Sequence, residues 1–239
     1  MVVSGHPLAS AVGAKILEQG GNAIDAAVAV GFALAVVLPE AGNLGGGGFL
    51  VYREDDGAVH ALDFRETAPA GASRDMYLDA DGELTQDSRI GHRASGVPGS
   101  VAGFSEMHKH YATLPWADLV EPAISLARGH EIDEVRSSHL ADGKSRLERF
   151  EPSARQFLLD GEAPRPGYRW VQPDLEVRNH RVCQARSVAE LQRQVMKFGA
   201  RDTRHGLLVV HADHIAADGH ILRRPVIQKV HQTVGLDVR

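Results

Sequence analysis

The sequence predicts an α+β fold, because a strand hairpin lies between two groups of helical segments. Apolar residues recur at helical spacing in residues 7–36. Two apolar runs joined by a turn signal follow in residues 49–64, and helical patterns return from residue 100. The 239 residues are 43% hydrophobic and 24% charged, which is ordinary for a globular protein with a sizeable core.

The first group contains two helices. Apolar residues recur at helical spacing from Leu8 to Leu17, and the glycine pair 20–21 follows as a C-terminal stop signal. Asn22 is then a suitable N-cap for a second helix over residues 23–37. This segment is apolar almost all round, so we expect it to be buried on several sides.

The hairpin and the later helices have simpler signals. A strand over residues 49–52 and a return strand over 58–64 flank Asp55-Asp56-Gly57, which is typical of a hairpin turn. Residues 65–98 have the scattered Gly, Pro and Asp of a loop. We expect helices at residues 100–111 and 116–128, and more exposed ones at 137–150 and 152–159.

Charge and hydropathy exclude some classes of partner. The formal net charge of −5 gives no reason to expect a nucleic acid or an anionic membrane. The longest apolar run, residues 26–39, is shorter than the ~20 residues that a membrane-spanning helix needs. No signal-peptide pattern opens the chain. On these grounds alone we expect a cytoplasmic protein, or one whose natural N-terminus precedes Met1.

The composition divides the chain near residue 175. Residues 176–239 carry 11 Lys+Arg and 6 Asp+Glu, and they hold 6 of the 13 histidines. Residues 1–175 carry 15 Lys+Arg and 25 Asp+Glu, so the two parts have opposite net charge. Within the second part, residues 187–190 have capping-box spacing and residues 207–210 could form a strand. A frameshift, a fusion and a genuine but unfamiliar segment each fit this change.

Four consecutive glycines, Gly45 to Gly48, precede the first strand. Glycine lets the main chain come close to a ligand or to another segment. The run is therefore either a loop that approaches a bound substrate or a point of tight packing where a helix leads into a strand. No Gly-Lys-Ser/Thr follows, so it is not a phosphate-binding loop.

Arg65 is the main candidate for ligand binding. It follows the second strand in the segment Asp63-Phe64-Arg65-Glu66-Thr67-Ala68-Pro69. A guanidinium at the end of a strand can bind a carboxylate through two parallel hydrogen bonds. The alternative is a structural ion pair with Asp63 or Glu66.

Other candidates are weaker. His211, Asp213, His214 and His220 lie close in sequence but lack a known metal-ligand spacing, so we predict no metal site. Cys183, the only cysteine, lies in a basic stretch that could lower its pKa, although an ordinary thiol is the simpler interpretation. There is no Gly-x-Ser-x-Gly motif of a serine hydrolase.

Several ordered blocks resemble the γ-glutamyltransferase (γ-glutamyltranspeptidase, glutathione hydrolase) family. The similarity is to the N-terminal part of the large subunit, in the bacterial and especially the proteobacterial version, and covers about residues 2–175. The matching blocks are Asn22–Ala29, Ala41–Phe49, Asp63–Pro69, Ala94–Gly103, Leu114–Trp116 and Glu121–Ile124.

The resemblance implies an N-terminal-nucleophile hydrolase, a four-layer αββα sandwich that is incomplete in this chain. Such proenzymes cleave themselves into a large and a small subunit, and the new N-terminal threonine attacks γ-glutamyl peptides such as glutathione. The acyl group then passes to water, amino acids or peptides, without a metal or organic cofactor. The resemblance also implies a periplasmic or extracellular location, and it assigns Arg65 to the α-carboxylate of the γ-glutamyl group.

The resemblance places the nucleophile outside the matched part. The threonines at positions 67, 85, 113, 203 and 233 do not lie in its motif. We therefore expect no catalytic residue in this chain and no turnover without a small-subunit portion. The alternatives are an inactive fragment and a remnant that binds glutamate or glutathione.

Overall fold

The computed structural model describes residues 1–42, 44–185, 190 and 227–229. Its helices are α1 Pro7–Glu18, α2 Ala23–Val37, α3 Ser100–Tyr111, α4 Trp116–Ala127, α5 Glu134–Leu147, α6 Glu151–Phe157 and α7 Pro173–Gln184. Its strands are β1 Phe49–Arg53, β2 Val59–Asp63, β3 His130–Glu131, β4 Arg169–Trp170 and β5 Ile227–Lys229. Two short 3₁₀ turns, η1 Gln86–Ser88 and η2 His92–Ala94, lie in the long loop after β2.

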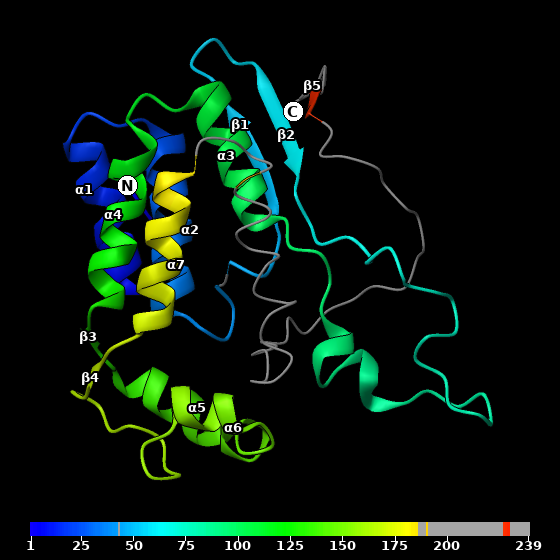
Figure 1. The fold of residues 1–239 in the computed structure, drawn as a ribbon. Helices are drawn as coiled ribbons and strands as arrows, with labels where there is room; N and C mark the ends of the chain where they lie inside the picture. Colours follow the sequence, from blue (N-terminus) through cyan, green and yellow to red (C-terminus); the bar gives the residue numbers. More distant parts are fainter. Residues whose placement is uncertain (43, 186–189, 191–226, 230–239) are drawn as a thin grey trace, which may run out of the picture.

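The main core is built around α2. Figure 1 shows α1, α4 and α7 beside α2, and α3 between this bundle and the strands β1 and β2. The fully buried ring of Phe32 on α2 makes edge contacts with Phe104 on α3 and with Trp116 on α4, at 5.1 and 5.4 Å between centroids. The prediction that residues 23–37 are buried on several sides is confirmed, because eleven of these fifteen residues are buried.

The strands β1, β2 and β5 form an antiparallel sheet with β2 in the centre. Phe49 pairs with Asp63 and Arg53 with Val59, so the hairpin predicted for residues 49–64 is confirmed. One face of the hairpin packs on α3, where Tyr52 contacts Tyr111 and Phe64 contacts Phe104. The opposite face presents Phe49 and Val51, which are 65% and 75% exposed.

A smaller core lies below the bundle. Ile132, Leu140, Phe157 and Trp170 pack together where α5 and α6 meet the short pair β3–β4. The helices predicted near residues 137–150 and 152–159 are present, and α5 begins earlier because Asp133 caps it by accepting the N–H of Arg136. The pattern gave no sign of β3 or β4, which are two residues each.

The helix α7 spans residue 175, where the composition changes, and packs on α4 through a hydrogen bond from Trp116 Nε1 to the carbonyl of Val182. The division of the chain at residue 175 stays a prediction. The helix and strand suggested near residues 187–190 and 207–210 lie outside the described residues, apart from Glu190. None of the helices in the described ranges is long and apolar enough to span a membrane.

Asp25 joins α2 to the loop before α4. Asn22 caps α2, and the Asp25 carboxylate in turn accepts the backbone N–H of Asn22, which completes a capping box. The same carboxylate accepts the backbone N–H groups of Thr113 and Leu114 and the hydroxyl of Thr113. Burial raises the pKa of Asp25, but the hydrogen bonds from Thr113, Asn22 and Leu114 outweigh it and bring the pKa below the usual 3.8. The side chain is thus a buried, fully hydrogen-bonded anion.

His6 caps α1 at the junction between the two cores. Its Nδ1 accepts the N–H of Leu8, and its Nε2 lies 3.2 Å from a carboxylate oxygen of Asp133. Arg136, which pairs with Glu40, lies close by. Burial lowers the pKa of His6 below its usual 6.5, and the Asp133 carboxylate opposes this shift only in part.

We expect the protein to lose stability as the pH falls below about 6.5. The unfolded chain then protonates His6 before the folded chain does, so the free energy of unfolding decreases until the folded pKa of His6 is reached. Protonation also removes the acceptor for Leu8. Urea unfolding between pH 8 and pH 5 checks this, and His6→Asn, which keeps a capping side chain, should weaken the pH dependence.

The control is His92→Asn, which removes an exposed histidine and should leave the pH dependence as in the wild type. Some dependence remains in His6→Asn, because burial also lowers the pKa of His130. Identical pH profiles for His6→Asn and the wild type would show that His6 does not carry the effect.

Candidate functional site

The main chain around Arg65 is enclosed by glycines from two other segments. A Cβ on Gly47 would lie 2.7 Å from Arg65 Cα, and one on Gly99 would overlap the carbonyl oxygen of Phe64. The N–H groups of Gly99 and Ser100 both bond to the carbonyl of Gly46, at 2.8 and 3.0 Å. The glycine run, the Arg65 segment and the start of α3 therefore form one tight layer.

This layer explains part of the glycine run. Gly47 and Gly48 both lie where a side chain would meet residues 64–66, as the packing interpretation predicts. Gly103 faces the ring of Phe64 in the same way from α3. The glycines thus fix the position of the Arg65 main chain.

The Arg65 side chain is exposed on the free face of the sheet. Phe49 is the pairing partner of Asp63, so their side chains share a face, and Arg65 follows two residues after Asp63 along the chain. The Arg65 guanidinium carbon lies 5.7 Å from the centroid of the Phe49 ring. Phe64, which lies between Asp63 and Arg65 in the sequence, points to the other face and contacts Phe104.

Arg65 makes no ion pair with any residue that the structure describes. Asp63 instead accepts the backbone N–H of Arg65, at 3.0 Å. In the described residues, the structure therefore does not contain the alternative, an ion pair of Arg65 with Asp63 or Glu66. An exposed guanidinium with free donors can bind a carboxylate from outside the chain.

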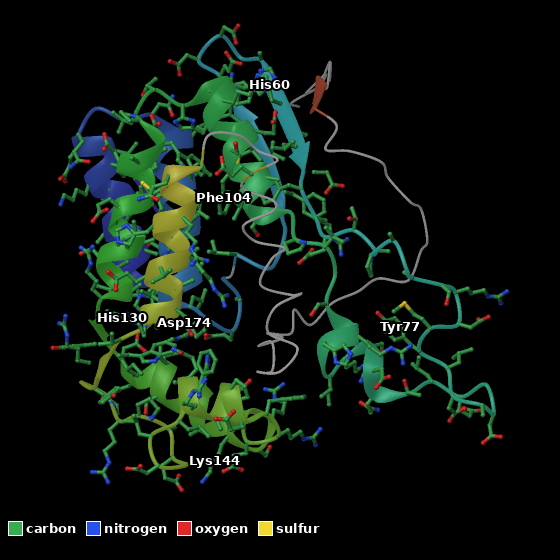
Figure 2. The ribbon with its side chains drawn as sticks, viewed as in Figure 1. His60, Tyr77, Phe104, His130, Lys144 and Asp174 are labelled. Carbon is green, nitrogen blue, oxygen red and sulfur yellow. The ribbon has the colours of Figure 1, made fainter. Side chains whose placement is uncertain are left out.

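The hydroxyls of Thr113 and Thr85 donate hydrogen bonds that stabilise the fold. Thr113 donates to Asp25, and Thr85 donates to the carbonyl of Tyr77 within the long loop. Figure 2 shows Tyr77 in this loop, away from the helical bundle. Thr67 bridges Val97 through its main chain. Thr203 and Thr233 lie outside the described residues.

The remaining candidates gain nothing from the structure. Burial, with Glu121 and Asp118 nearby, raises the pKa of Cys183, which agrees with an ordinary thiol. Within the described ranges no group of three His, Cys, Asp or Glu residues could hold a metal ion. The cluster of His211, Asp213, His214 and His220 lies outside those ranges.

The comparison with known families decides the class. Residues 9–178 match the model of the family described as gamma-glutamyltranspeptidase. The chain belongs to this family. The glutathione hydrolase proenzyme of Escherichia coli is 47% identical over 178 residues, which is 73% of this chain and 31% of that protein. The acylase ACY 1 proenzyme of Pseudomonas sp. strain V22 is 42% identical over 182 residues, or 33% of that protein.

Solved structures agree with this family. The gamma-glutamyltranspeptidase of Helicobacter pylori superposes with a TM-score of 0.76 at 42% identity, covering 83% of this chain and 60% of that chain. The Pseudomonas nitroreducens enzyme in complex with L-DON gives a TM-score of 0.73 at 36% identity, covering 83% and 61%. The γ-glutamyltranspeptidase family and the α+β fold of an N-terminal-nucleophile hydrolase, both expected from the sequence, are confirmed.

This γ-glutamyltranspeptidase family member spans about a third of the length of the curated relatives it matches, 31% for the Escherichia coli protein. In the described ranges its β1–β2–β5 sheet is covered by α3 on one face, and no second sheet lies against Phe49 and Val51. The part of the sandwich that the structure describes is one sheet with its outer helical layer.

Sequence reasoning missed two components of the site. Phe49 was assigned to a strand without a role, although the hairpin register already places it on the side of Arg65. Gly99 stands in a matching block without an assigned role, and its closeness to the Phe64 carbonyl depends on how α3 packs on β2. The spacing of Gly96, Gly99 and Gly103 was the available signal for this packing.

Proposed function

We propose that this chain supplies the carboxylate-binding part of a γ-glutamyltransferase that acts on γ-glutamyl peptides such as glutathione. The family membership and the exposed, unpaired Arg65 support this assignment. In this proposal Arg65 binds the α-carboxylate of the γ-glutamyl group through its planar fork of N–H donors. Gly47 and Gly99 hold the main chain of Arg65 in place, so the side chain that carries the guanidinium begins at a fixed position.

The chemical step in this proposal belongs to a part that the 239 residues do not contain. An N-terminal threonine attacks the γ-carbonyl carbon, the peptide amine leaves with a proton, and water or an amine then takes the acyl group. The chain needs a small-subunit portion for this reaction and is inactive by itself. The proposed location is periplasmic or extracellular, as the resemblance implies.

The test combines the chain alone with a chimera. The chimera is the Escherichia coli glutathione hydrolase proenzyme in which this chain's matched segment replaces the corresponding one. With γ-glutamyl-p-nitroanilide we expect no p-nitroaniline from the chain alone and turnover by the chimera. Arg65→Ala in the chimera should lower kcat/KM by roughly 30-fold or more, because a charged hydrogen-bonded contact is worth about 2 kcal/mol or more.

The matched control is Arg53→Ala, which removes an equal charge from an exposed position on the same face of the sheet. This variant should keep kcat/KM within about 3-fold of the parent chimera, the range of a screened surface charge. If the two variants lost kcat/KM equally, Arg65 would contribute only its positive charge, and not a specific contact with the carboxylate. Turnover by the 239-residue chain alone would overturn the assignment of the nucleophile to a missing part.

A second candidate is a binding module that holds glutamate or glutathione without chemistry. The specific observation in its favour is that the Arg65 guanidinium is already exposed and free of protein carboxylates in the described part of the chain. Calorimetric titration of the chain with L-glutamate tests it. Binding that Arg65→Ala abolishes, in a chain without turnover, would favour this candidate.

A further inference from the structure

We propose that Phe49 is the positioning residue of Arg65: its ring holds the guanidinium over the free face of the sheet, where the fork meets a carboxylate. This inference rests on the proposed function and adds to it a residue that acts through the arginine. Phe49 is the first residue of β1, and Arg65 lies two residues after the end of β2. Their contact is the ring-to-guanidinium approach of 5.7 Å.

The first argument is the register. Phe49 and Asp63 are directly paired, and side chains of directly paired residues project to the same face of a sheet. Arg65 continues this face two residues further, so its side chain lies on the same side of the sheet as the Phe49 ring. The backbone N–H of Arg65 donates a hydrogen bond to the Asp63 carboxylate, which keeps the main chain extended beyond the last paired residue.

The second argument is what else could hold the side chain. Among the residues that the structure describes, Arg65 has no carboxylate partner, and its main chain alone is enclosed by Gly47 and Gly99. An arginine side chain has several rotatable bonds, and free rotation costs entropy when a ligand binds. A ring within about 6 Å attracts the cation through its face and restricts this rotation. The N–H donors need not be used in such a contact, so they stay available for a carboxylate.

The third argument concerns Phe49 itself. The residue is 65% exposed in the part of the chain that the structure describes, on the face that the second sheet of a complete αββα sandwich would cover. Val51, on the same face and 75% exposed, shows that the neighbouring part of this face is apolar. An apolar face would be served equally well by an aliphatic residue, whereas an attraction to the guanidinium requires a ring. Substitutions that keep or remove the ring therefore separate the two explanations.

The experiment uses the full 239-residue chain and observes the Arg65 Nε–H signal by NMR, assigned by its disappearance in Arg65→Lys. The wild type should show a ring-current shift that is lost in Phe49→Leu and kept in Phe49→Tyr and in the control Val51→Ala. L-glutamate is then added, and its dissociation constant is read from the same signal. We expect Phe49→Leu to weaken binding roughly 2- to 5-fold, and Phe49→Tyr to restore it.

Each outcome decides a different point. A wild-type signal without a ring-current shift overturns the contact and with it the inference. If Phe49→Leu loses the shift but binds glutamate as the wild type does, the inference is overturned while the proposed function stands. If glutamate leaves the Arg65 signal of the wild type unchanged, the isolated chain binds no carboxylate at Arg65 and the carboxylate role of Phe49 fails, while the chimera tests the proposed function separately. Weakened binding in Phe49→Leu with recovery in Phe49→Tyr supports both.

Discussion

Replacing Asp25 with alanine is expected to lower the free energy of unfolding by about 3–5 kcal/mol, the range for disrupting a buried charged network. The substitution leaves the N–H groups of Asn22, Thr113 and Leu114 without the acceptor that the fully buried Asp25 carboxylate provides. Because small domains are stable by only about 5–15 kcal/mol, this loss is a large part of the total. Urea unfolding at pH 7 measures it through the transition midpoint.

Two further variants separate charge from packing. Asp25→Asn keeps the shape but brings an NH₂ group toward N–H donors, so it should cost nearly as much as alanine. Thr113→Val removes only the hydroxyl that donates to Asp25 and should cost about 1 kcal/mol. A loss below about 1 kcal/mol for Asp25→Ala would mean that the carboxylate does not hold α2 to this loop.

Replacing Gly99 with alanine is expected to remove carboxylate binding by Arg65 almost as completely as removing the arginine. The added methyl group would overlap the carbonyl oxygen of Phe64, so the main chain of residues 64–66 must shift. The cost in stability should be about 1–3 kcal/mol, as for other overpacked sites. The loss of kcat/KM in the chimera should reach roughly 30-fold, because the guanidinium moves with its main chain.

The control for this variant is Gly71→Ala. Gly71 lies in the loop after Arg65, with open space around the position of a Cβ. This variant should keep both the stability and the kcat/KM of its parent. If Gly99→Ala retains kcat/KM within about 2-fold of the parent, the main chain at Arg65 tolerates displacement and the enclosing glycines serve packing alone.

Local patterns predicted the elements that have strong local signals. The periodic apolar residues of α1 and α2, the Asn22 cap and the turn before β2 are all present as expected. By contrast, the role of Asp25 could not be predicted from its own segment, because its partner Thr113 is 88 positions away. The helix α7 is mostly polar, and only its contacts with α4 account for its place in the core.

The same distinction holds for the site. The resemblance identified Arg65 as a candidate binding residue, because a sequence motif can be matched without knowing what surrounds the residue in space. The enclosure of its main chain depends on Gly47 and Gly99, which are distant in sequence and meet only when α3 lies on the sheet. The role of Phe49 required the hairpin register, which fixes the face of every side chain at once.

The free face of the sheet links assembly to ligand affinity. Arg65 emerges beside Phe49 and Val51, so a protein surface that covers these two side chains also removes water from around the guanidinium. Linkage makes this effect mutual: a partner that tightens carboxylate binding by roughly ten-fold is itself bound roughly ten-fold more tightly when the carboxylate is present. In the proposed enzyme, bound substrate would then strengthen the association between this chain and the partner that covers the face.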